Sequence, residues 1–147
     1  SATIKKSYNT GNIGASMDRQ SVCMGGIIGF YPYLVEDCYN TGKIGGTTLD
    51  GEMGPFNAGG IAGHGEPTTD SAIKRCYNIG EISAQTAGGI IGYRYGMNIY
   101  NCYYTTANKG VGDGSQSNTY YLTTQQLRNA SGLSTFDFNS VIGLLVK

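Results

Sequence analysis

The 147-residue chain contains no tryptophan, one histidine and three prolines, and only 14% of its residues are charged. Its ten basic residues are matched by ten acidic ones and form no basic stripe, so we expect no nucleic-acid partner. No apolar run approaches the roughly 20 residues of a membrane-spanning helix. Long charged or polar tracts, which favour disorder, are missing too. The composition therefore predicts one folded domain without a membrane span.

The N-terminus lacks the charged segment followed by an apolar one that marks a secretion signal. Repeated sequence starts at Ile4 without a leader, as if the chain were cut from a longer protein. We therefore expect neighbouring domains in a longer parent chain, and the missing signal says little about the compartment.

Tyrosine, with 12 copies, recurs within a block that appears four times without gaps. The four copies are IKKSYNTGNI from Ile4, VEDCYNTGKI from Val35, IKRCYNIGEI from Ile73 and IYNCYYTTAN from Ile99. Their spacings are 31, 38 and 26 residues. Self-similarity at such a period is the sequence signature of a repeat architecture.

A second block, with a double glycine, lies between the tyrosine blocks in three copies, GGIIG, GGIAG and GGIIG. We expect the double glycine to mark a corner that needs either positive φ or close approach of backbones. The repeat glycines are Gly25, Gly26, Gly29, Gly59, Gly60, Gly63, Gly88, Gly89 and Gly92.

The repeat unit is too short and too rich in glycine for helices, and no 3.6-residue periodicity is sustained. Its shortest copy has room for about three short strands with turns between them. The sequence predicts an all-β fold, a parallel β-helix or solenoid of three to four coils, with repeats over residues 1–104. Stacked coils would place equivalent residues about 4.8 Å apart, in ladders.

Alternation along a strand assigns a direction to each residue of the tyrosine block. We place Cys38, Cys76 and Cys102 inward, with Ser7 at the same position of the first copy. The next residue then points outward, which predicts an exposed ladder of stacked rings that could bind sugars. The tyrosines of this ladder are Tyr8, Tyr39, Tyr77 and Tyr103, which Tyr31, Tyr33, Tyr93 and Tyr95 could widen. The residue after it would form an amide ladder of Asn9, Asn40 and Asn78.

The blocks resemble the GLUG motif repeats, which are named for a Gly-Leu-any-Gly signature. The residues that carry the resemblance are Gly26-Ile27-Ile28-Gly29, Gly60-Ile61-Ala62-Gly63 and Gly89-Ile90-Ile91-Gly92, together with the Cys-Tyr-Asn-Thr-Gly blocks. Isoleucine replaces the eponymous leucine. The resemblance implies a right-handed β-helical repeat region of a bacterial secreted or cell-surface protein, and it brings no catalytic residues with it.

The pattern decays after the fourth tyrosine block. Residues 105–119 are glycine-rich and predict a loop. Thr123 followed by Gln126 forms a capping box, which predicts a short helix that Gly132 would end. Residues 120–147 would then form a helix-containing cap over the last coil, whose edge and core would otherwise be bare.

The cysteines allow three interpretations. In register, their β-carbons would lie about 4.8 Å apart, farther than a disulfide prefers, which favours buried free thiols. A disulfide that involves Cys23 and a metal site are the alternatives, although no CxxC pair of the zinc type is present.

Candidates for catalysis are few. The single histidine, His64, lies near Glu66 and Asp70, but no nucleophile signature accompanies it, which favours a loop residue. The segment GDGSQSN has one carboxylate, Asp113, and lacks the alternating ligands of a calcium loop, so a turn-rich loop is favoured and no cofactor or metal is expected.

Adjacent carboxylates at Glu36 and Asp37 raise the question of glycoside chemistry, which some β-helical proteins perform. They would point to opposite faces of a strand, and the matching positions of neighbouring coils are Lys5 and Lys6, then Lys74 and Arg75. We therefore expect ion pairs between coils, Lys5 or Lys74 with Glu36 and Lys6 or Arg75 with Asp37.

These observations predict a noncatalytic structural or adhesive module, extracellular or on a bacterial cell surface, with host glycans or matrix proteins as candidate partners. A carbohydrate-binding module that uses the tyrosine ladder is one alternative. An accessory domain of a surface peptidase or glycosidase is another, and the parent chain would distinguish it.

Overall fold

A computed structural model describes residues 2–14, 22–46, 57–107 and 109–128. These residues lie mostly in short strands, and every strand pairing among them is parallel. The one helix, α1 (Thr124–Arg128), has five residues. The expected all-β class is confirmed. Within the described part of the chain, no helix combines the length and the apolar character needed to cross a bilayer.

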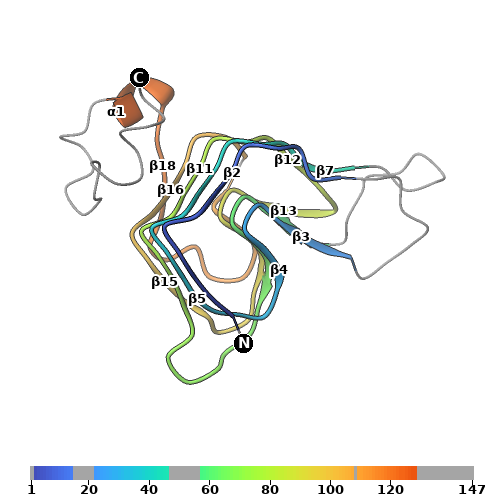
Figure 1. The fold of residues 1–147 in the computed structure, drawn as a ribbon, viewed down its shortest axis with the longest axis vertical. Helices are drawn as coiled ribbons and strands as arrows, with labels where there is room; N and C mark the ends of the chain where they lie inside the picture. Colours follow the sequence, from blue (N-terminus) through green and yellow to red (C-terminus); the bar gives the residue numbers. More distant parts are fainter. Residues whose placement is uncertain (1, 15–21, 47–56, 108, 129–147) are drawn as a thin grey trace.

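Successive passes of the chain lay equivalent strands beside one another, and Figure 1 shows these passes nested. One sheet contains β1 (Ala2–Lys5), β5 (Pro32–Glu36), β10 (Ala72–Lys74) and β15 (Asn98–Tyr100). The next contains β2 (Tyr8–Asn9), β6 (Tyr39–Asn40), β11 (Tyr77–Asn78), β16 (Cys102–Tyr104) and β18 (Thr119–Tyr121).

Three further sheets hold the remaining strands. A short one pairs β7 (Ile44–Gly45) with β12 (Ile82–Ser83). Another contains β3 (Cys23–Gly25), β8 (Asn57–Gly59) and β13 (Thr86–Gly88). The last contains β4 (Ile28–Phe30), β9 (Ala62–Gly65), β14 (Ile91–Arg94) and β17 (Val111–Asp113).

The register between passes follows the repeat. Tyr39 pairs with Tyr8 on one side and with Tyr77 on the other, and Tyr77 pairs with Tyr103. In the same way, β8 places Gly59 between Gly25 and Gly88 of its neighbours. The alignment of repeats in the sequence is therefore also an alignment in space.

The chain turns between the first two sheets at a residue with a left-handed backbone conformation. The φ angles at this position are 48° at Lys6, 54° at Asp37, 47° at Arg75 and 52° at Asn101. None of these residues is glycine, although this region costs an ordinary residue about 1–2 kcal/mol. The peptide N–H groups of Lys6, Asp37 and Arg75 each donate to a carbonyl of the next pass, which helps to hold the turn.

The double glycines are sites of close approach, one of the two roles expected for them. The other expected role, a positive φ angle, is wrong, because no glycine of these pairs has a positive φ. A β-carbon added to Gly26 would lie 2.6 Å from Asn40 Cγ, and one added to Gly60 would lie 2.2 Å from Asn78 Cγ. In the last pass the ring of Tyr104 takes the place of asparagine and packs on Gly89. The second glycine of each block therefore makes room for the residue opposite it.

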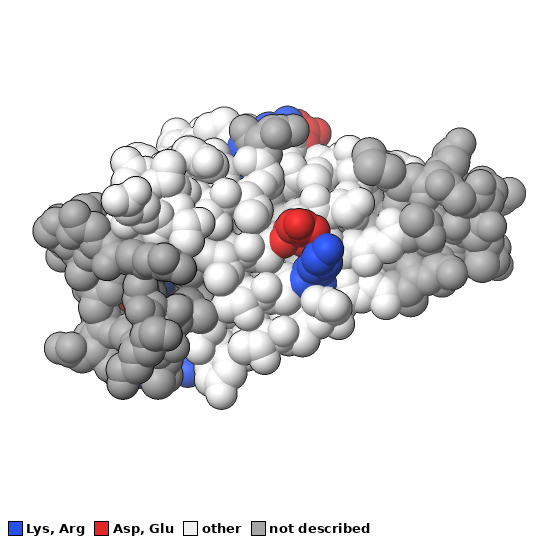
Figure 2. Space-filling model, turned by 90° about the horizontal axis from the view of Figure 1, so that it is seen from above, with Lys and Arg blue, Asp and Glu red and all other residues white. Residues whose placement is uncertain are grey.

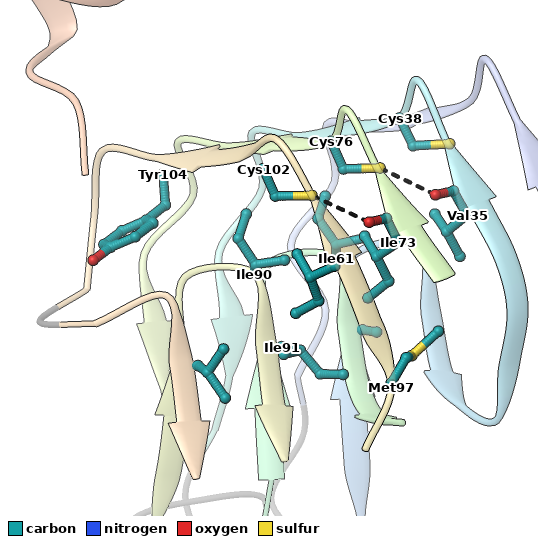
Figure 3. Close-up of a cluster of buried hydrophobic side chains, with 13 residues drawn as sticks. Val35, Cys38, Ile61, Ile73, Cys76, Ile90, Ile91, Met97, Cys102 and Tyr104 are labelled. Atoms are coloured by element: carbon teal, nitrogen blue, oxygen red, sulfur yellow. Dashed lines mark hydrogen bonds between the residues drawn. The ribbon is translucent and has the colours of Figure 1, made fainter. Parts of the chain in front are cut away.

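The core lies between the sheets and is built mainly from isoleucine and cysteine (Figure 3). Its larger cluster includes the fully buried Val35, Ile61, Ile73, Ile90 and Ile91. A smaller cluster forms around Ile44, Ala58 and Ala84. The branched residues that follow the double glycines and those that open the tyrosine blocks thus both contribute to the apolar packing.

The tail differs in part from expectation. The segment predicted as a loop over 105–119 contains β17, whose Val111 pairs with Ile91, so the sheet continues one strand further. The capping box is confirmed, because Gln126 N–H donates to Thr123 Oγ1 at 3.1 Å and Thr123 N–H donates to Gln126 Oε1 at 2.8 Å. Gly132 and most of the cap expected over 120–147 lie outside the described residues.

Candidate functional site

The asparagines form the expected ladder between passes. Asn9 Nδ2 donates to Asn40 Oδ1 at 2.8 Å, and Asn40 Nδ2 donates to Asn78 Oδ1 at 2.7 Å. Each amide also closes a turn of its own pass: Asn40 donates to the carbonyl of Gly42 and accepts from its N–H. The fully buried Asn40 amide thus makes two donor and two acceptor bonds, its full capacity. This ladder is a structural element.

The tyrosine column stacks at its first step but is not an exposed ladder. The rings of Tyr8 and Tyr39 lie 5.1 Å apart and 7° from parallel. Tyr8 is 60% exposed, whereas Tyr39 is 5% exposed and Tyr77 is fully buried. The predicted exposure is therefore wrong for Tyr39 and Tyr77. Each of these two residues pairs in register with a tyrosine on both sides, whereas Tyr8 has one such neighbour.

Two further rings of the column bear on its use as a site. Tyr103 is half-buried and lies 5.5 Å from Tyr120, tilted by 34°. The buried Tyr77 hydroxyl has no hydrogen-bond partner among the described residues, and burial raises its pKa. A sugar could therefore reach only the outer members of this column.

The three repeat cysteines are fully buried, as expected, and Figure 3 shows their side chains directed into the core. All four cysteines are free thiols, so the alternative disulfide at Cys23 is not formed. Cys76 Sγ lies 3.6 Å from the carbonyl of Val35 and Cys102 Sγ 3.6 Å from that of Ile73, both in the preceding pass. Burial raises the pKa of Cys76, which keeps this thiol protonated and unreactive.

Ion pairs cross between passes beside the turn. Lys5 Nζ lies 3.0 Å from Glu36 Oε2, and Arg75 Nε lies 2.7 Å from Asp37 Oδ1. Arg75 also contacts Glu36, so the prediction that the two carboxylates point to opposite faces is wrong. The left-handed φ of Asp37 breaks the alternation of the strand and turns both carboxylates toward one guanidinium.

The remaining charges near these sheets are sparse. Lys74 lies 5.5 Å from the ring centre of Tyr100 instead of pairing with Glu36. The face seen in Figure 2 is almost uncharged and carries one adjoining acidic and basic pair near its centre. Both carboxylates of the Glu36–Asp37 pair are thus neutralised by basic groups, which argues against their use as a catalytic dyad.

An aromatic surface lies instead on the sheet of β4, β9 and β14. Phe30 pairs in register with His64, and His64 with Tyr93. Their ring centres are 4.6 Å and 4.8 Å apart. Tyr31 packs edge-on against Phe30 at 4.0 Å, and Tyr95 lies parallel to Tyr93 at 6.5 Å. We call these five residues the aromatic face.

Glu66 supplies the carboxylate of this surface. Its Oε1 accepts a hydrogen bond from the Tyr31 hydroxyl at 3.2 Å. His64 Nε2 lies 3.3 Å from the same oxygen, close enough for an ion pair when the imidazole is protonated, but it is not aligned for a hydrogen bond. Glu66 raises the pKa of Tyr31, second to desolvation of the phenol. His64 is therefore one ring of an aromatic column, where sequence analysis favoured a loop residue.

A depression of about 480 Å³ lies where the fourth pass is shorter than the others. Among the described residues, that pass adds no strand beside β12 or β13, so both end their sheets. The lining is mostly small and apolar, and it includes Ile82, Ala84, Ala87 and Lys109. It presents no pair of groups suited to acid–base chemistry.

Metal binding has no support in the described part of the chain, where no three or more histidine, cysteine and carboxylate side chains gather as a ligand set. Asp113 lies on β17 in register with Tyr93 and is exposed. It borders the aromatic face and is part of a strand, where a loop was expected.

The aromatic face was only partly predicted from the sequence. Tyr31, Tyr93 and Tyr95 were noted as loop residues, but Phe30 was not, and His64 was treated alone. The signal was available: the last glycine of each double-glycine block is followed by a ring, in Gly29-Phe30, Gly63-His64 and Gly92-Tyr93. Three different residue types at this position hid the column.

Comparisons with known proteins give no relative: no family model, no curated protein and no solved structure matches this chain.

Proposed function

We propose that the chain is a noncatalytic structural and adhesive repeat module, built as a right-handed β-solenoid. The parallel, in-register pairing of successive passes supports the solenoid, and the handedness follows the resemblance to GLUG repeats. In this proposal the module holds a binding surface at a fixed place on a bacterial secreted or cell-surface protein. Host glycans or matrix proteins are its partners.

One observation carries the noncatalytic proposal: the polar residues of the second tyrosine block are occupied by contacts between passes. The amide of Asn40 uses all its hydrogen-bonding capacity within the ladder. Glu36 and Asp37 are held by Lys5 and Arg75. A catalytic carboxylate or amide has to exchange partners with a substrate, and these have none to spare.

The extracellular assignment is also a proposal. It is supported by the sequence resemblance and by the low charge and high glycine and tyrosine content of the chain. The three buried cysteines do not oppose it, because thiols sealed in a core are protected from oxidation by their lack of exposure.

The test combines an activity screen with an adsorption assay. Purified protein is incubated with reporter substrates of glycosidases, polysaccharide lyases and peptidases, and no turnover proportional to protein concentration is expected. Adsorption to immobilised fibronectin, collagen and mucin is measured in parallel, and saturable binding to at least one is expected. Turnover that disappears in Glu36→Gln or Glu66→Gln would overturn the noncatalytic proposal, and absence of adsorption would overturn the adhesive one.

A further inference from the structure

We propose that the aromatic face, made of Phe30, Tyr31, His64, Tyr93 and Tyr95, binds a neutral polysaccharide. The inference deepens the adhesive part of the proposed function by naming the ligand class and the residues. It moves the carbohydrate site away from the repeated tyrosine column to the sheet of β4, β9 and β14.

Exposure is the first argument. Phe30, Tyr31 and Tyr95 are 42%, 47% and 60% exposed, which is high for rings that also contact one another. A monomeric protein rarely leaves contiguous aromatic surface in water unless the surface has a partner. Tyrosine supplies large contact area at little cost in conformational entropy and carries a hydroxyl for hydrogen bonding.

Shape is the second argument. The column Phe30–His64–Tyr93 runs across three passes at centre spacings of 4.6 Å and 4.8 Å. Each ring leans on the next, and the 4.0 Å contact of Phe30 with Tyr31 closes the space between them. No enclosed cage for a compact cation is left between these rings. The outer sides of the rings instead form one broad surface, which suits the C–H face of linked sugar rings.

The polar groups at the rim fit hydroxyls. Glu66 Oε1 is engaged by Tyr31, whereas no bond to Glu66 Oε2 is made by a described residue. A free carboxylate oxygen can accept hydrogen bonds from a sugar's hydroxyl groups, and phenol hydroxyls beside it can donate to them. The surface thus combines apolar area with a few fixed polar atoms, the usual make-up of a ligand site.

Charge decides against an acidic polymer. The carboxylates of the half-buried Glu66 and the exposed Asp113 border the aromatic face. Arg94, the basic residue nearest to it along the chain, donates instead to the carbonyls of Met97, Ser115 and Ser117. Among the described residues, an anionic glycan would meet negative charge at this surface without a free cation nearby, so the inferred ligand class is neutral.

Tyr31 adds an independent observation. Its φ of 51° is rare for a bulky residue. This conformation costs energy of order 1–3 kcal/mol and points to a position held for a purpose. Here it accompanies the contact of the ring with Phe30 and the bond of the hydroxyl to Glu66.

The test measures retention of the protein on cellulose, chitin, β-1,3-glucan and α-mannan, with heparin as an anionic comparison. Binding to at least one neutral polymer is expected. Tyr95→Ala and Phe30→Ala should each weaken it by about tenfold, the upper end for one aromatic contact. Tyr8→Ala is the matched control, because Tyr8 is also 60% exposed but lies on another sheet, and it should bind as the parent does.

One further variant and one competitor sharpen the result. Glu66→Gln, which keeps the shape, should weaken binding by no more than a few-fold, and choline chloride should not compete. Thermal unfolding midpoints within a few degrees of the parent show that each variant is folded. Three results would overturn the proposal. The first is no retention on any neutral polymer, and the second is a loss of binding in Tyr8→Ala equal to that in the other variants. The third is competition by choline together with full loss of binding in Glu66→Gln. Adsorption to matrix proteins tests the adhesive proposal separately, so the two failures are distinguishable.

Discussion

The interior ladders and the aromatic face follow opposite rules. Along β2, β6 and β11 the same residues recur in each pass, and Asn40, Cys38 and Tyr39 are buried. Along β4, β9 and β14 the equivalent outward position holds Phe30, then His64, and then Tyr93. Repetition of residue type therefore marks positions that are bonded to their own copies above and below.

The physical basis of this difference is the number of partners a residue must match. The middle asparagine of the ladder, Asn40, bonds the asparagine above, the one below and a glycine of its own pass, so its position requires the paired donor and acceptor of a side-chain amide. A ring on the outer face needs only a neighbouring ring to lean on. Variation in residue type is tolerated there.

The largest expected effect is a difference in thiol reactivity between interior and more accessible cysteines. In native protein Cys38, Cys76 and Cys102 should react with a thiol reagent at least about a thousandfold more slowly than in denatured protein, because labelling requires global opening. Cys23, which is half-buried, should react sooner. Mass spectrometry of timed samples measures both rates. Rapid labelling of all three repeat cysteines would contradict their interior placement.

Gly60→Ala should be strongly destabilising. The added β-carbon would lie 2.2 Å from Asn78 Cγ and 2.3 Å from the carbonyl oxygen of Gly89, both fixed parts of the core. We expect a loss of about 3 kcal/mol or more in the free energy of unfolding, measured by urea denaturation. Gly11→Ala is the control, because its nearest atom would be 3.7 Å away. Similar losses in both variants would show that close approach at the double glycine is unimportant.

Asn40→Leu tests the ladder itself. Leucine has a similar size but leaves the polar groups of Asn9, Gly42 and Asn78 without their partner, which should cost about 3 kcal/mol in urea denaturation. Asn9→Leu should cost less, because Asn9 has only one asparagine neighbour and is partly exposed. A neutral result at Asn40 would remove the ladder from the account of stability.

The sequence predicted correctly the features that depend on residues repeated from block to block. Strand alternation placed Cys38 and Asn40 inside, and the block alignment gave the pairing of Tyr39 with Tyr8 and Tyr77. It could not give the exposure of the tyrosines, because alternation fixes the direction of a side chain but not what covers it. Tyr77 points the expected way and is still fully buried.

Other features were not predicted because residue type alone does not determine local backbone geometry. The turn holds Lys6, Asp37, Arg75 and Asn101, of which only asparagine and aspartate favour a left-handed conformation. Strand β17 was taken for a loop because its glycines resemble a turn. Its Gly-Val-Gly nevertheless aligns with Ile90-Ile91-Gly92, and Val111 continues the core.

The ion pairs beside the turn predict a modest dependence of stability on pH. Lys5 and then Arg75 lower the pKa of Glu36 in the folded state. A depressed carboxyl pKa contributes stability that is present above the unfolded pKa of about 4.3 and is lost as the pH falls through the folded value. Glu36→Gln should lower the free energy of unfolding by up to about 1 kcal/mol at pH 7 and by less at pH 3.

Urea denaturation at pH 7 and at pH 3 measures this difference for the parent and for Glu36→Gln. Glu81→Gln is the control, because Glu81 pairs with Lys43 in a far more exposed bridge. An equal pH response in the two variants would mean that the burial of the Glu36 pair adds nothing.

The smallest expected effect concerns the left-handed turn between the first two sheets. Lys6 is exposed and has a φ of 48°. Lys6→Gly should relieve about 1 kcal/mol of backbone strain in the folded state. The greater conformational freedom of glycine in the unfolded chain should offset part of this gain, so the free energy of unfolding should rise by about 0.5 kcal/mol. Lys6→Ala keeps the strain and removes the same side chain, so it should be neutral. Urea denaturation of the pair isolates the backbone, and equal stabilities would show that the turn stores no strain at this position.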